Sequence, residues 1–269
     1  MNVSTDTKRL KARMNDIQVR LLFDKVIKPY KQHNDPNYYY SIVDQHHGVF
    51  LGHLPKAAYM NYTTTLHFQG YSDDSPLLKA IFAIVPLEQW FASEIHVAVD
   101  FHKPYEQFHA VRPAKRADPE WYPKGLYLGG ASSATRLLIY DKQDEMWRRK
   151  HIGTDDWTRA ELRFSFTPMK RIRDIAVEDF SAADQYMLFT DIASLPDNIK
   201  AIVTNLNQNR IQWEDVHWKM KKKIRECAAT SEQAINLHGP ILSTLRNQDI
   251  GSFIYKPTKQ LGVLSSLEE

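Results

Sequence analysis

Three strand-like segments of the chain carry side chains that could take part in phosphate chemistry. In residues 95–102 apolar and polar positions alternate strictly, and His96 and Asp100 share the polar face. In residues 158–166 a similar alternation places Glu161 between two arginines. Carboxylates on neighbouring strands, with a histidine beside them, would suit a divalent cation such as Mg²⁺. This ion binds one or two protein carboxylates and leaves positions for water and phosphate oxygens.

The remaining segment, residues 135–142, contains Tyr140, with Lys142 on the same face. Beside a metal site a tyrosine phenol could attack phosphorus, because the metal stabilises charge on the phosphate and the phenol oxygen forms the covalent link. Lys142 could lower the pKa of the phenol or hold a phosphate. However, a strand tyrosine is more often a packing residue, and a glutamate between arginines is more often an exposed ion pair. Spacing alone leaves these alternatives open.

The composition is that of an ordinary globular protein, and it excludes several function classes. Of 269 residues, 43% are hydrophobic and 25% are charged, so the chain can bury a full core. The single cysteine, Cys227, excludes a disulfide framework and zinc sites built from several cysteines. We find no Gly-x-x-x-x-Gly-Lys loop, no signal-peptide run and no apolar stretch of membrane-spanning length. We therefore expect a cytoplasmic protein without an ATP site of its own and without a membrane partner.

Basic residues are clustered, although the formal net charge is only +3. Such clusters neutralise phosphates and release counterions, so a local basic face matters more than the net charge. Together they favour an acidic partner, although any single cluster could be a solvated surface. The clusters are Arg112, Lys115 and Arg116; Arg148, Arg149, Lys150 and His151; Lys170, Arg171 and Arg173; and Lys219, Lys221, Lys222, Lys223 and Arg225.

The elements that must position these residues follow an α+β pattern, with a mainly antiparallel sheet core and a helical C-terminal region. The first half predicts a charged tail or short helix at 1–14, strands at 17–23, 38–51 and 56–68, and a helix at 77–85 capped by Ser75 and Pro76. The second half predicts strands at 95–102, 125–129, 135–142 and 158–166, a loop at 105–123, helices at about 175–190, 196–206, 211–228 and 231–246, and a frayed tail from 257.

A short internal repeat is visible in the two strand-rich parts. The run Gly48-Val49-Phe50-Leu51-Gly52, followed by Tyr62, echoes the run Gly125-Leu126-Tyr127-Leu128-Gly129, followed by Tyr140. In both parts the pattern continues as strand, turn, strand and helical stretch. A duplicated sheet-plus-helix unit, covering residues 17–90 and 91–168 and forming a saddle-like sheet, would explain this similarity.

Four motifs follow one another at a fixed spacing between residues 125 and 164. They are Leu126-Tyr127-Leu128-Gly129, Ala131-Ser132-Ser133, Leu138-Ile139-Tyr140-Asp141-Lys142 and Trp157-Thr158-Arg159-Ala160-Glu161-Leu162-Arg163. Upstream lies the acidic strand Ile95-His96-Val97-Ala98-Val99-Asp100. Over roughly residues 95–165 this order resembles the core of the Rep_trans family of plasmid rolling-circle replication initiators. His96 stands where that family usually has an aspartate.

The resemblance implies a mechanism and a set of site residues. Tyr140 would attack the scissile phosphate at a double-strand origin and keep the 5′ end, leaving a 3′-OH that primes replication, and the DNA would later be rejoined. Asp100 and Glu161, helped by His96, would hold Mg²⁺ or Mn²⁺. Lys142 and Arg159 would lie near the phosphate.

The resemblance also implies partners and a division of the chain. The protein would bind supercoiled plasmid origin DNA with an exposed hairpin, recruit a host helicase and act as a homodimer with a second Tyr140. Residues 1–168 would form the antiparallel-sheet catalytic core, and residues 169–269 would complete it and contribute to DNA binding. The residues expected to contact the origin are Lys219, Lys221, Lys222, Lys223 and Arg225.

Three alternatives remain open from the sequence. A conjugative relaxase of an integrative element would share the tyrosine-strand core and would nick a transfer origin. An origin-binding initiator without strand cleavage would need neither a metal nor Tyr140. A DNA- or RNA-binding protein whose tyrosines only stack bases would bind single strands broadly and with strong salt dependence.

Overall fold

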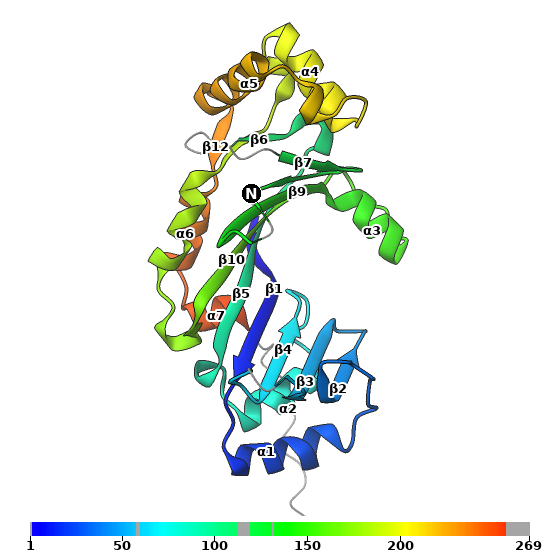
Figure 1. Cartoon of the computed structure of the whole chain (residues 1–269), viewed down its shortest axis with the longest axis vertical. Helices are drawn as coiled ribbons and strands as arrows, with labels where there is room; N and C mark the ends of the chain where they lie inside the picture. The colour runs from blue at the N-terminus through cyan, green and yellow to red at the C-terminus, as the bar shows by residue number, and fades with distance from the viewer. Residues whose placement is uncertain (1, 58–59, 112–118, 131, 257–269) are drawn as a thin grey trace, which may run out of the picture. The chain divides into compact units, whose positions relative to one another are not determined.

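The computed structural model describes residues 2–57, 60–111, 119–130 and 132–256 (Figure 1). It is 37% helical and 33% strand with a large antiparallel sheet core, which confirms the predicted α+β class. The chain divides into two compact units, which we describe one at a time. The first comprises Met1–Asp6, Glu94–Pro168 and Ile175–Gln248, and the second comprises Thr7–Ser93, Met169–Asp174 and Asp249–Glu269.

The first unit is built on strands that are hydrogen-bonded in the order β1-β5-β10-β9-β8-β7. The pairs β7–β8, β8–β9 and β9–β10 are antiparallel. The strands β1, β5 and β10 contribute residues to both units. Their bounds are β1 (Asn2–Ala12), β5 (Phe91–Phe101), β7 (Pro119–Tyr122), β8 (Gly125–Leu128), β9 (Thr135–Asp141) and β10 (Thr158–Arg171).

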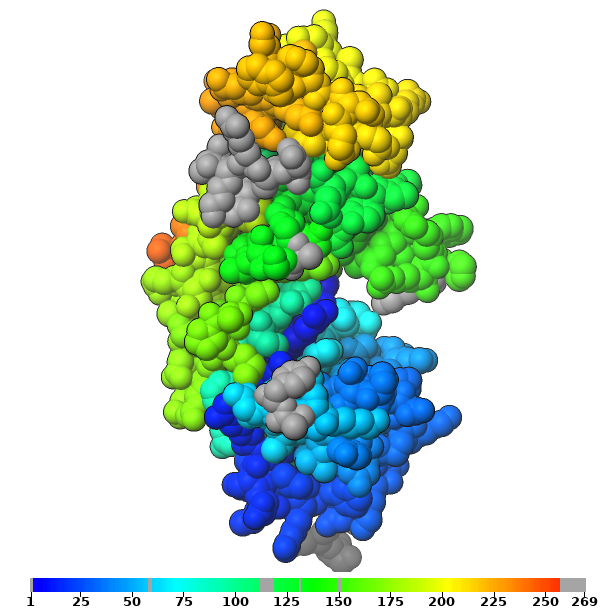
Figure 2. Space-filling view, in the orientation of Figure 1, coloured from blue at the N-terminus to red at the C-terminus, as the bar shows by residue number. Residues whose placement is uncertain are grey.

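One face of this sheet is covered by other elements of the first unit. Leu137, Ile139 and Leu162 on this face are fully buried. The Phe164 ring lies 4.9 Å from the ring of Phe180 in the 3-10 segment η5 (Val177–Gln185), against which helix α6 (His238–Arg246) packs. Figure 1 shows α6 beside β10 and β5, whereas α3 (Lys142–Lys150) projects from the end of β9. In Figure 2 the green atoms of α3 stand out from the surface of the unit.

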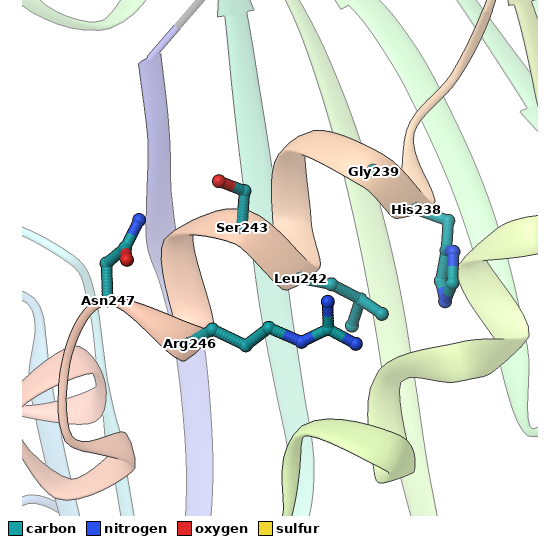
Figure 3. Close-up of a pocket in the computed structure, with 6 residues that line it drawn as sticks. All are labelled: His238, Gly239, Leu242, Ser243, Arg246 and Asn247. Carbon is teal, nitrogen blue, oxygen red and sulfur yellow. The ribbon is translucent and has the colours of Figure 1, made fainter.

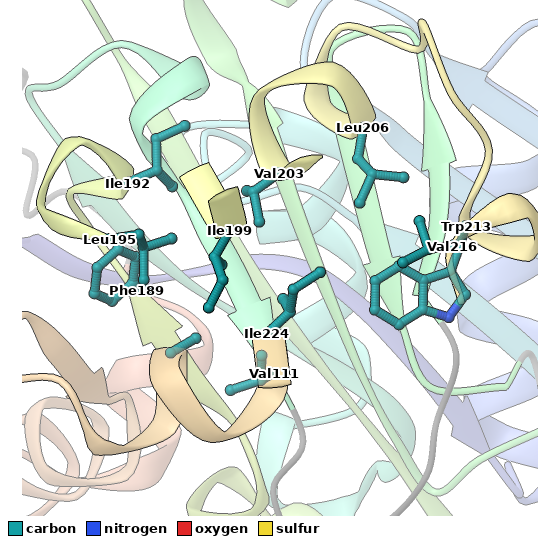
Figure 4. Close-up of a cluster of buried hydrophobic side chains, with 11 residues drawn as sticks. Val111, Phe189, Ile192, Leu195, Ile199, Val203, Leu206, Trp213, Val216 and Ile224 are labelled. Carbon is teal, nitrogen blue, oxygen red and sulfur yellow. The ribbon is translucent and has the colours of Figure 1, made fainter. Parts of the chain in front are cut away.

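A second, three-stranded sheet of the first unit has the order β12-β11-β6. Together with α4 and α5 it encloses a hydrophobic cluster that includes Phe189, Ile199, Trp213 and Ile224 (Figure 4). The elements are η3 (Tyr105–Gln107), β6 (His109–Val111), β11 (Met187–Phe189), η6 (Ile192–Ser194), α4 (Asp197–Asn207), η7 (Trp213–Asp215), α5 (Trp218–Thr230) and β12 (Ala234–Asn236).

The second unit contains a sheet of order β2-β3-β4-β1 that packs on short helices. Its core is aromatic: the Phe82 ring lies 5.9 Å from Phe68, 6.1 Å from Trp90 and 4.7 Å from Tyr255. The elements are α1 (Asp16–Leu22), the π-helix η1 (Phe23–Ile27), β2 (Tyr38–Asp44), β3 (Val49–Pro55), β4 (Thr64–Phe68), α2 (Pro76–Ile84), η2 (Leu87–Gln89), η4 (Ile172–Asp174) and α7 (Ile250–Ile254).

Two expectations for the start of the chain are wrong. Residues 1–14 are not a tail or helix, because β1 pairs with β4 and buries Lys8, Leu10 and Ala12 in strict alternation. Because Lys8 is one of these buried residues, the apolar alternation of β1 is not apparent in the sequence. Residues 17–23 are helical instead of extended. Leu22 is buried in the helix, whereas Ile17, an apolar position of the apparent alternation, is 70% exposed.

Most of the remaining predicted elements are confirmed, with exceptions at several strand positions. The strands at 95–102, 125–129, 135–142 and 158–166 correspond to β5, β8, β9 and β10, and the helix at 77–85 corresponds to α2 with its Ser75 cap. The predicted strand at 38–51 is divided into β2 and β3, and the predicted strand at 56–68 contains β4 only at its end. The predicted loop at 105–123 contains β6 and β7, the predicted helix at 175–190 ends in β11, and the predicted helix at 231–246 contains β12 before α6. The strands β6, β7, β11 and β12 have three or four residues each, which is too short for a repeating pattern to show in the sequence. The expected tail from 257 lies outside the described residues.

Candidate active site

The opposite face of the first unit's sheet brings the predicted site residues together. In the β9–β10 ladder Tyr140 is directly opposite Arg159, and Leu138 is opposite Glu161. Because side chains alternate along each strand, Tyr140, Arg159 and Glu161 point to the same side of the sheet. Arg159 and Glu161 are 9% and 5% exposed, so the alternative of an exposed ion pair does not hold for Glu161.

Three side chains from three strands form a cluster that could bind a metal ion. Asp6 of β1, His96 of β5 and Glu161 of β10 each offer one ligand atom, and these atoms all lie within 4.8 Å of one another. Two carboxylates and one imidazole are donors that Mg²⁺ and Mn²⁺ accept. The structure thus contains a possible Asp-His-Glu metal site, which includes two of the three ligands expected from the sequence.

The electrostatics of this cluster favour a positive charge. Nδ1 of His96 lies 2.6 Å from Oε1 of Glu161, and its Nε2 contacts Oε1 of Glu94. Burial lowers the pKa of His96, but the hydrogen bonds with these two carboxylates outweigh it, so the pKa of His96 is raised. Burial raises the pKa of Glu161, and the hydrogen bond and charge of His96 reverse this, so that the pKa of Glu161 is lowered. The His96 imidazole therefore lies between two carboxylates that favour its protonated form, in a place that attracts cations.

Asp100 occupies a different position in the site. Arg159 donates to both of its oxygens, with Nε 2.7 Å from Oδ1 and Nη2 2.9 Å from Oδ2. The indole of Trp157 also donates to Oδ1, at 2.8 Å. The remaining guanidinium nitrogen, Nη1, donates to Oδ1 of Asp6 at 2.8 Å. Asp100 thus fixes the orientation of Arg159, and its role as a metal ligand stays a prediction.

Tyr140 is half-buried beside this network. Burial raises the pKa of its phenol, and the negative charge of Glu161 adds to this, while the positive charge of Arg159 opposes it. The phenol is therefore protonated at neutral pH in the metal-free protein. A cation bound at Glu161 would remove part of the charge that holds the proton on Tyr140.

Lys142 lies near Tyr140, but in a different element from the one expected. The strand β9 ends at Asp141, whose side chain accepts a hydrogen bond from the backbone N–H of Asp144 and caps α3. Lys142 is the first residue of that helix. Its Nζ lies 5.6 Å from the Tyr140 ring centroid and 2.6 Å from Oε2 of Glu145. Its predicted contact with phosphate remains untested.

The predicted DNA-binding residues lie on α5, apart from the network around Tyr140. Lys219 lies over the Trp218 ring at 5.7 Å, and Lys221 and Arg225 lie over the Trp213 ring at 5.3 Å and 5.5 Å. Trp218 is 63% exposed. Lys222 and Lys223 are exposed on the same helix. Their contact with an origin stays a prediction, as does the contribution of the other basic clusters. Of these, Arg112, Lys115 and Arg116 lie outside the described residues.

Two acidic residues of the site were missed by the sequence analysis. Asp6 lies in the segment that was expected to be a tail, so it was not considered as a ligand. Glu94 lies two residues before His96 on the same face of β5, and this even spacing could have indicated it. The threonines and valine around Asp6 are residues typical of strands and were the available signal for β1.

A shallow depression elsewhere in the first unit contributes no residue to this site. It runs along α6 and is lined by His238, Gly239, Leu242, Ser243, Arg246 and Asn247 (Figure 3). In the described part of the chain, no helix is long and apolar enough to cross a lipid bilayer.

Comparisons with known proteins give a structural likeness of low similarity. No protein-family model matches the chain, and no curated protein matches it at a significant level. Among solved structures, the chain is similar to a rolling circle replication initiator protein from Geobacillus stearothermophilus, with 13% sequence identity and a TM-score of 0.42. The match covers 77% of this chain and 96% of that chain. Similarity at this level does not decide the function, which has to be derived from the site itself.

Proposed function

We propose that this protein cuts and rejoins one DNA strand through Tyr140, and that it does so to initiate rolling-circle replication of a plasmid. The observation that carries the proposal is the shared sheet face. A tyrosine, an arginine held by two aspartates and an Asp-His-Glu cluster meet there from four neighbouring strands. Phosphoryl transfer needs a nucleophile, a fixed positive charge and a cation site within reach of one phosphate.

Asp6, His96 and Glu161 would hold the divalent cation, Mg²⁺ or Mn²⁺. The donor set fits such an ion. His96 would bind it as the neutral imidazole, so the cation would take the place of the proton that the neighbouring carboxylates favour. When bound, the ion would neutralise negative charge on the phosphate oxygens during the attack. Glu94, which contacts the other nitrogen of His96, would orient the imidazole in the manner of an outer carboxylate.

The side chains of this protein would perform the transfer. The Oη atom of Tyr140 attacks phosphorus, the bond from phosphorus to the 3′ oxygen breaks, and the proton of the phenol is passed on to the departing 3′ oxygen. The product is a 5′-phosphotyrosine and a free 3′-OH, and the reverse reaction rejoins the strand. Arg159, which Asp100 and Asp6 hold in place, contributes a fixed positive charge. Lys142 would contribute a second one.

The assignment to plasmid replication rests on the motif resemblance around Tyr140 and is part of the proposal. A replication initiator of this kind would bind a supercoiled origin, recruit a helicase of the host and use Tyr140 of a second copy to resolve the covalent intermediate. The basic face of α5 would contact the origin duplex.

The test is covalent capture on DNA. The protein is incubated with Mn²⁺ and a supercoiled plasmid that carries the DNA flanking its coding sequence, denatured with detergent and analysed for protein attached to a 5′ end. We expect an adduct with the wild type and none with Tyr140→Phe, although this variant still binds the plasmid. Tyr39→Phe, at a tyrosine that is 67% exposed in the second unit, is the matched control and should form the adduct. An adduct that persists in Tyr140→Phe would refute the proposal.

The same experiment separates the alternatives. Cleavage within a transfer origin instead of a replication origin would indicate a conjugative relaxase. Specific binding through α5 without any adduct would indicate an initiator that does not cut, an alternative that the exposed Trp218 and the basic residues around it support.

A further inference from the structure

Beside the candidate active site, the same face of the sheet carries four residues that no step of the proposed reaction uses. We call Tyr122 of β7, Tyr127 of β8, Arg136 of β9 and Arg163 of β10 the arginine–tyrosine strip. Arg136 and Arg163 are directly opposite each other in the β9–β10 ladder, two pairs beyond Leu138 and Glu161. Tyr127 is opposite Leu138 on the other side of β9. By strand alternation the strip continues the face that carries Tyr140.

Contacts within the strip orient its arginines. The guanidinium carbon of Arg136 lies 4.0 Å from the centroid of the Tyr127 ring, and that of Arg163 lies 5.4 Å from it. The phenol oxygen of Tyr127 also accepts a hydrogen bond from Nη2 of Arg163 at 3.4 Å. An arginine stacked on an aromatic ring keeps its planar group of donors in a fixed direction, so little conformational entropy remains to be lost on binding.

The strip has unpaired donors, and its two positive charges lie close together. The Nε atoms of Arg136 and Arg163 are buried and have no hydrogen-bond partner among the described residues. Two like charges directly opposite each other on adjacent strands repel. Glu120 pairs with Nη2 of Arg136 at 2.8 Å, and Glu161 lies 3.6 Å from Nε of Arg163, beyond hydrogen-bond range. An anion that contacts the accessible terminal nitrogens of the two guanidinium groups would offset this repulsion.

The outer end of the strip offers an aromatic surface. Tyr122 is 47% exposed, and its ring meets the edge of Tyr127 at 5.2 Å. Its chain neighbour Trp121 points to the other face of β7, where it stacks with His109 and contacts Trp213. The backbone at Tyr122 is thereby anchored, while its ring stays accessible. Aromatic rings of this kind are stacking platforms for unpaired bases.

We infer that the arginine–tyrosine strip binds the single-stranded DNA next to the scissile phosphate. Arg136 and Arg163 contact a backbone phosphate, and an unpaired base stacks on Tyr122. The inference rests on the proposed function for the choice of DNA as ligand. Arg163 is two residues from the metal-cluster residue Glu161 on β10, about 7 Å along the strand, and Arg136 is one strand spacing of ~4.8 Å from Arg163. Tyr122 on β7 is three strand spacings, about 14 Å, from β10. A few nucleotides of an extended strand cover such a distance. A strand held there would present the next phosphate to Tyr140.

The combination of charge and stacking points to unpaired DNA over other occupants. A duplex would bury its bases and leave Tyr122 without a partner. A second copy of this chain could occupy the strip only if it placed an anionic group against Arg136 and Arg163. The test therefore includes a measurement of the oligomeric state.

The experiment measures binding without cleavage. Tyr140→Phe protein in a chelator is titrated with a short fluorescent single-stranded oligonucleotide, and anisotropy is followed at several salt concentrations. Adding Arg136→Ala should weaken binding about tenfold at low salt and reduce the slope of log affinity against log salt by about 0.7, the value for one lost phosphate contact on a single strand. Tyr122→Ala should weaken binding at least about fivefold with the slope unchanged, since stacking is not ionic. Arg136→Lys keeps the charge and loses the stacked guanidinium group, so its affinity should lie between those of the parent and Arg136→Ala.

Arg246→Ala, at an exposed arginine on α6, is the matched control and should bind like the parent. The inference is overturned if Arg136→Ala and Tyr122→Ala, folded by circular dichroism, bind the oligonucleotide with parental affinity. It is also overturned if they change the oligomeric state in sedimentation while binding is retained. These results are independent of adduct formation by the wild type. Failure of the strip and failure of the tyrosine mechanism can therefore be told apart.

Discussion

At the candidate active site, two aspartates contact Arg159 and differ in what else they can bind. Both oxygens of Asp100 accept hydrogen bonds from the guanidinium group, and Oδ1 also accepts one from Trp157. Asp6 contacts Arg159 through Oδ1 and at the same time lies in the cluster with His96 and Glu161. Asp100, which belongs to the acidic-strand motif, therefore positions Arg159. Asp6, which lies outside that motif, is placed to bind the metal.

A metal titration separates these two roles. Asp6→Asn removes a charged ligand and should weaken Mn²⁺ binding by about tenfold or more, whereas Asp100→Asn should change it by less than about threefold. Binding is measured by isothermal titration or by the loss of the free Mn²⁺ signal in electron paramagnetic resonance. Asp191→Asn, at the cap of η6, is the control for a lost surface charge. A larger effect of Asp100→Asn than of Asp6→Asn would assign the metal to the residue expected from the sequence.

The sequence allowed part of this site to be predicted, for identifiable reasons. Tyr140, Arg159 and Glu161 lie on strands with clear alternation, so their common face follows from the pattern. Asp6 could not be found in this way, because it lies 153 residues from Arg159 in the chain and only the folded sheet brings them together. The bidentate hydrogen bonding of Arg159 to Asp100 depends on side-chain conformations that the spacing of residues in the sequence does not encode.

At the scale of the elements, the start of the chain shows how a local pattern can mislead. Residues 16–22 alternate like a strand, but their boundary signals are helical. Asn15 accepts a hydrogen bond from the backbone of Gln18, and the Gln18 side chain bonds back to the backbone of Asn15, forming a capping box. Leu22 and Val26, four residues apart, are fully buried. The capping residues are visible in the sequence and outweigh the apparent alternation.

The cap can be tested by substitution. Asn15→Ala removes the acceptor for the N–H of Gln18 and should lower the free energy of unfolding by about 1 kcal/mol. Asn15→Asp keeps an acceptor oxygen and should be within about 0.5 kcal/mol of the wild type. The measurement is urea unfolding followed by far-ultraviolet circular dichroism. Equal stability of Asn15→Ala and the wild type would show that α1 is held by packing of its buried face alone.

At the scale of the whole molecule, each unit encloses a neutral histidine. His109 on β6 in the first unit and His53 on β3 in the second are both 1% exposed. Burial lowers the pKa of each imidazole from 6.5 to about 4. In both rings one nitrogen has no hydrogen-bond partner among the described residues, so protonation would place an uncompensated charge in the core.

Because of these two histidines, we expect the folded protein to lose stability in mild acid. The unfolded chain takes up a proton at each site below its ordinary pKa, while the folded protein stays neutral until pH is near 4. The free energy of unfolding therefore falls as pH decreases between these values. From about pH 7.5 to about pH 5.5 each histidine should contribute a loss of about 1.4 kcal/mol. His109→Gln and His53→Gln should each reduce this pH dependence in denaturant unfolding, and His102→Gln, at an exposed position, should leave it unchanged. An unaltered pH dependence in both buried variants would contradict the prediction.

The first strand of the sheet also has a consequence for the order in which the site is made. β1 leaves the ribosome before its partner strands β4 and β5, and the site is complete only after β10, the next strand beyond β5, has been synthesised. At ordinary translation rates roughly 8 to 30 seconds separate the synthesis of Asp6 from that of Arg159 and Glu161. A nascent or prematurely ended chain then carries the first aspartate of the cluster without the arginine and glutamate that complete it. Under the proposed function, a chain that ends before β10 cannot cut DNA.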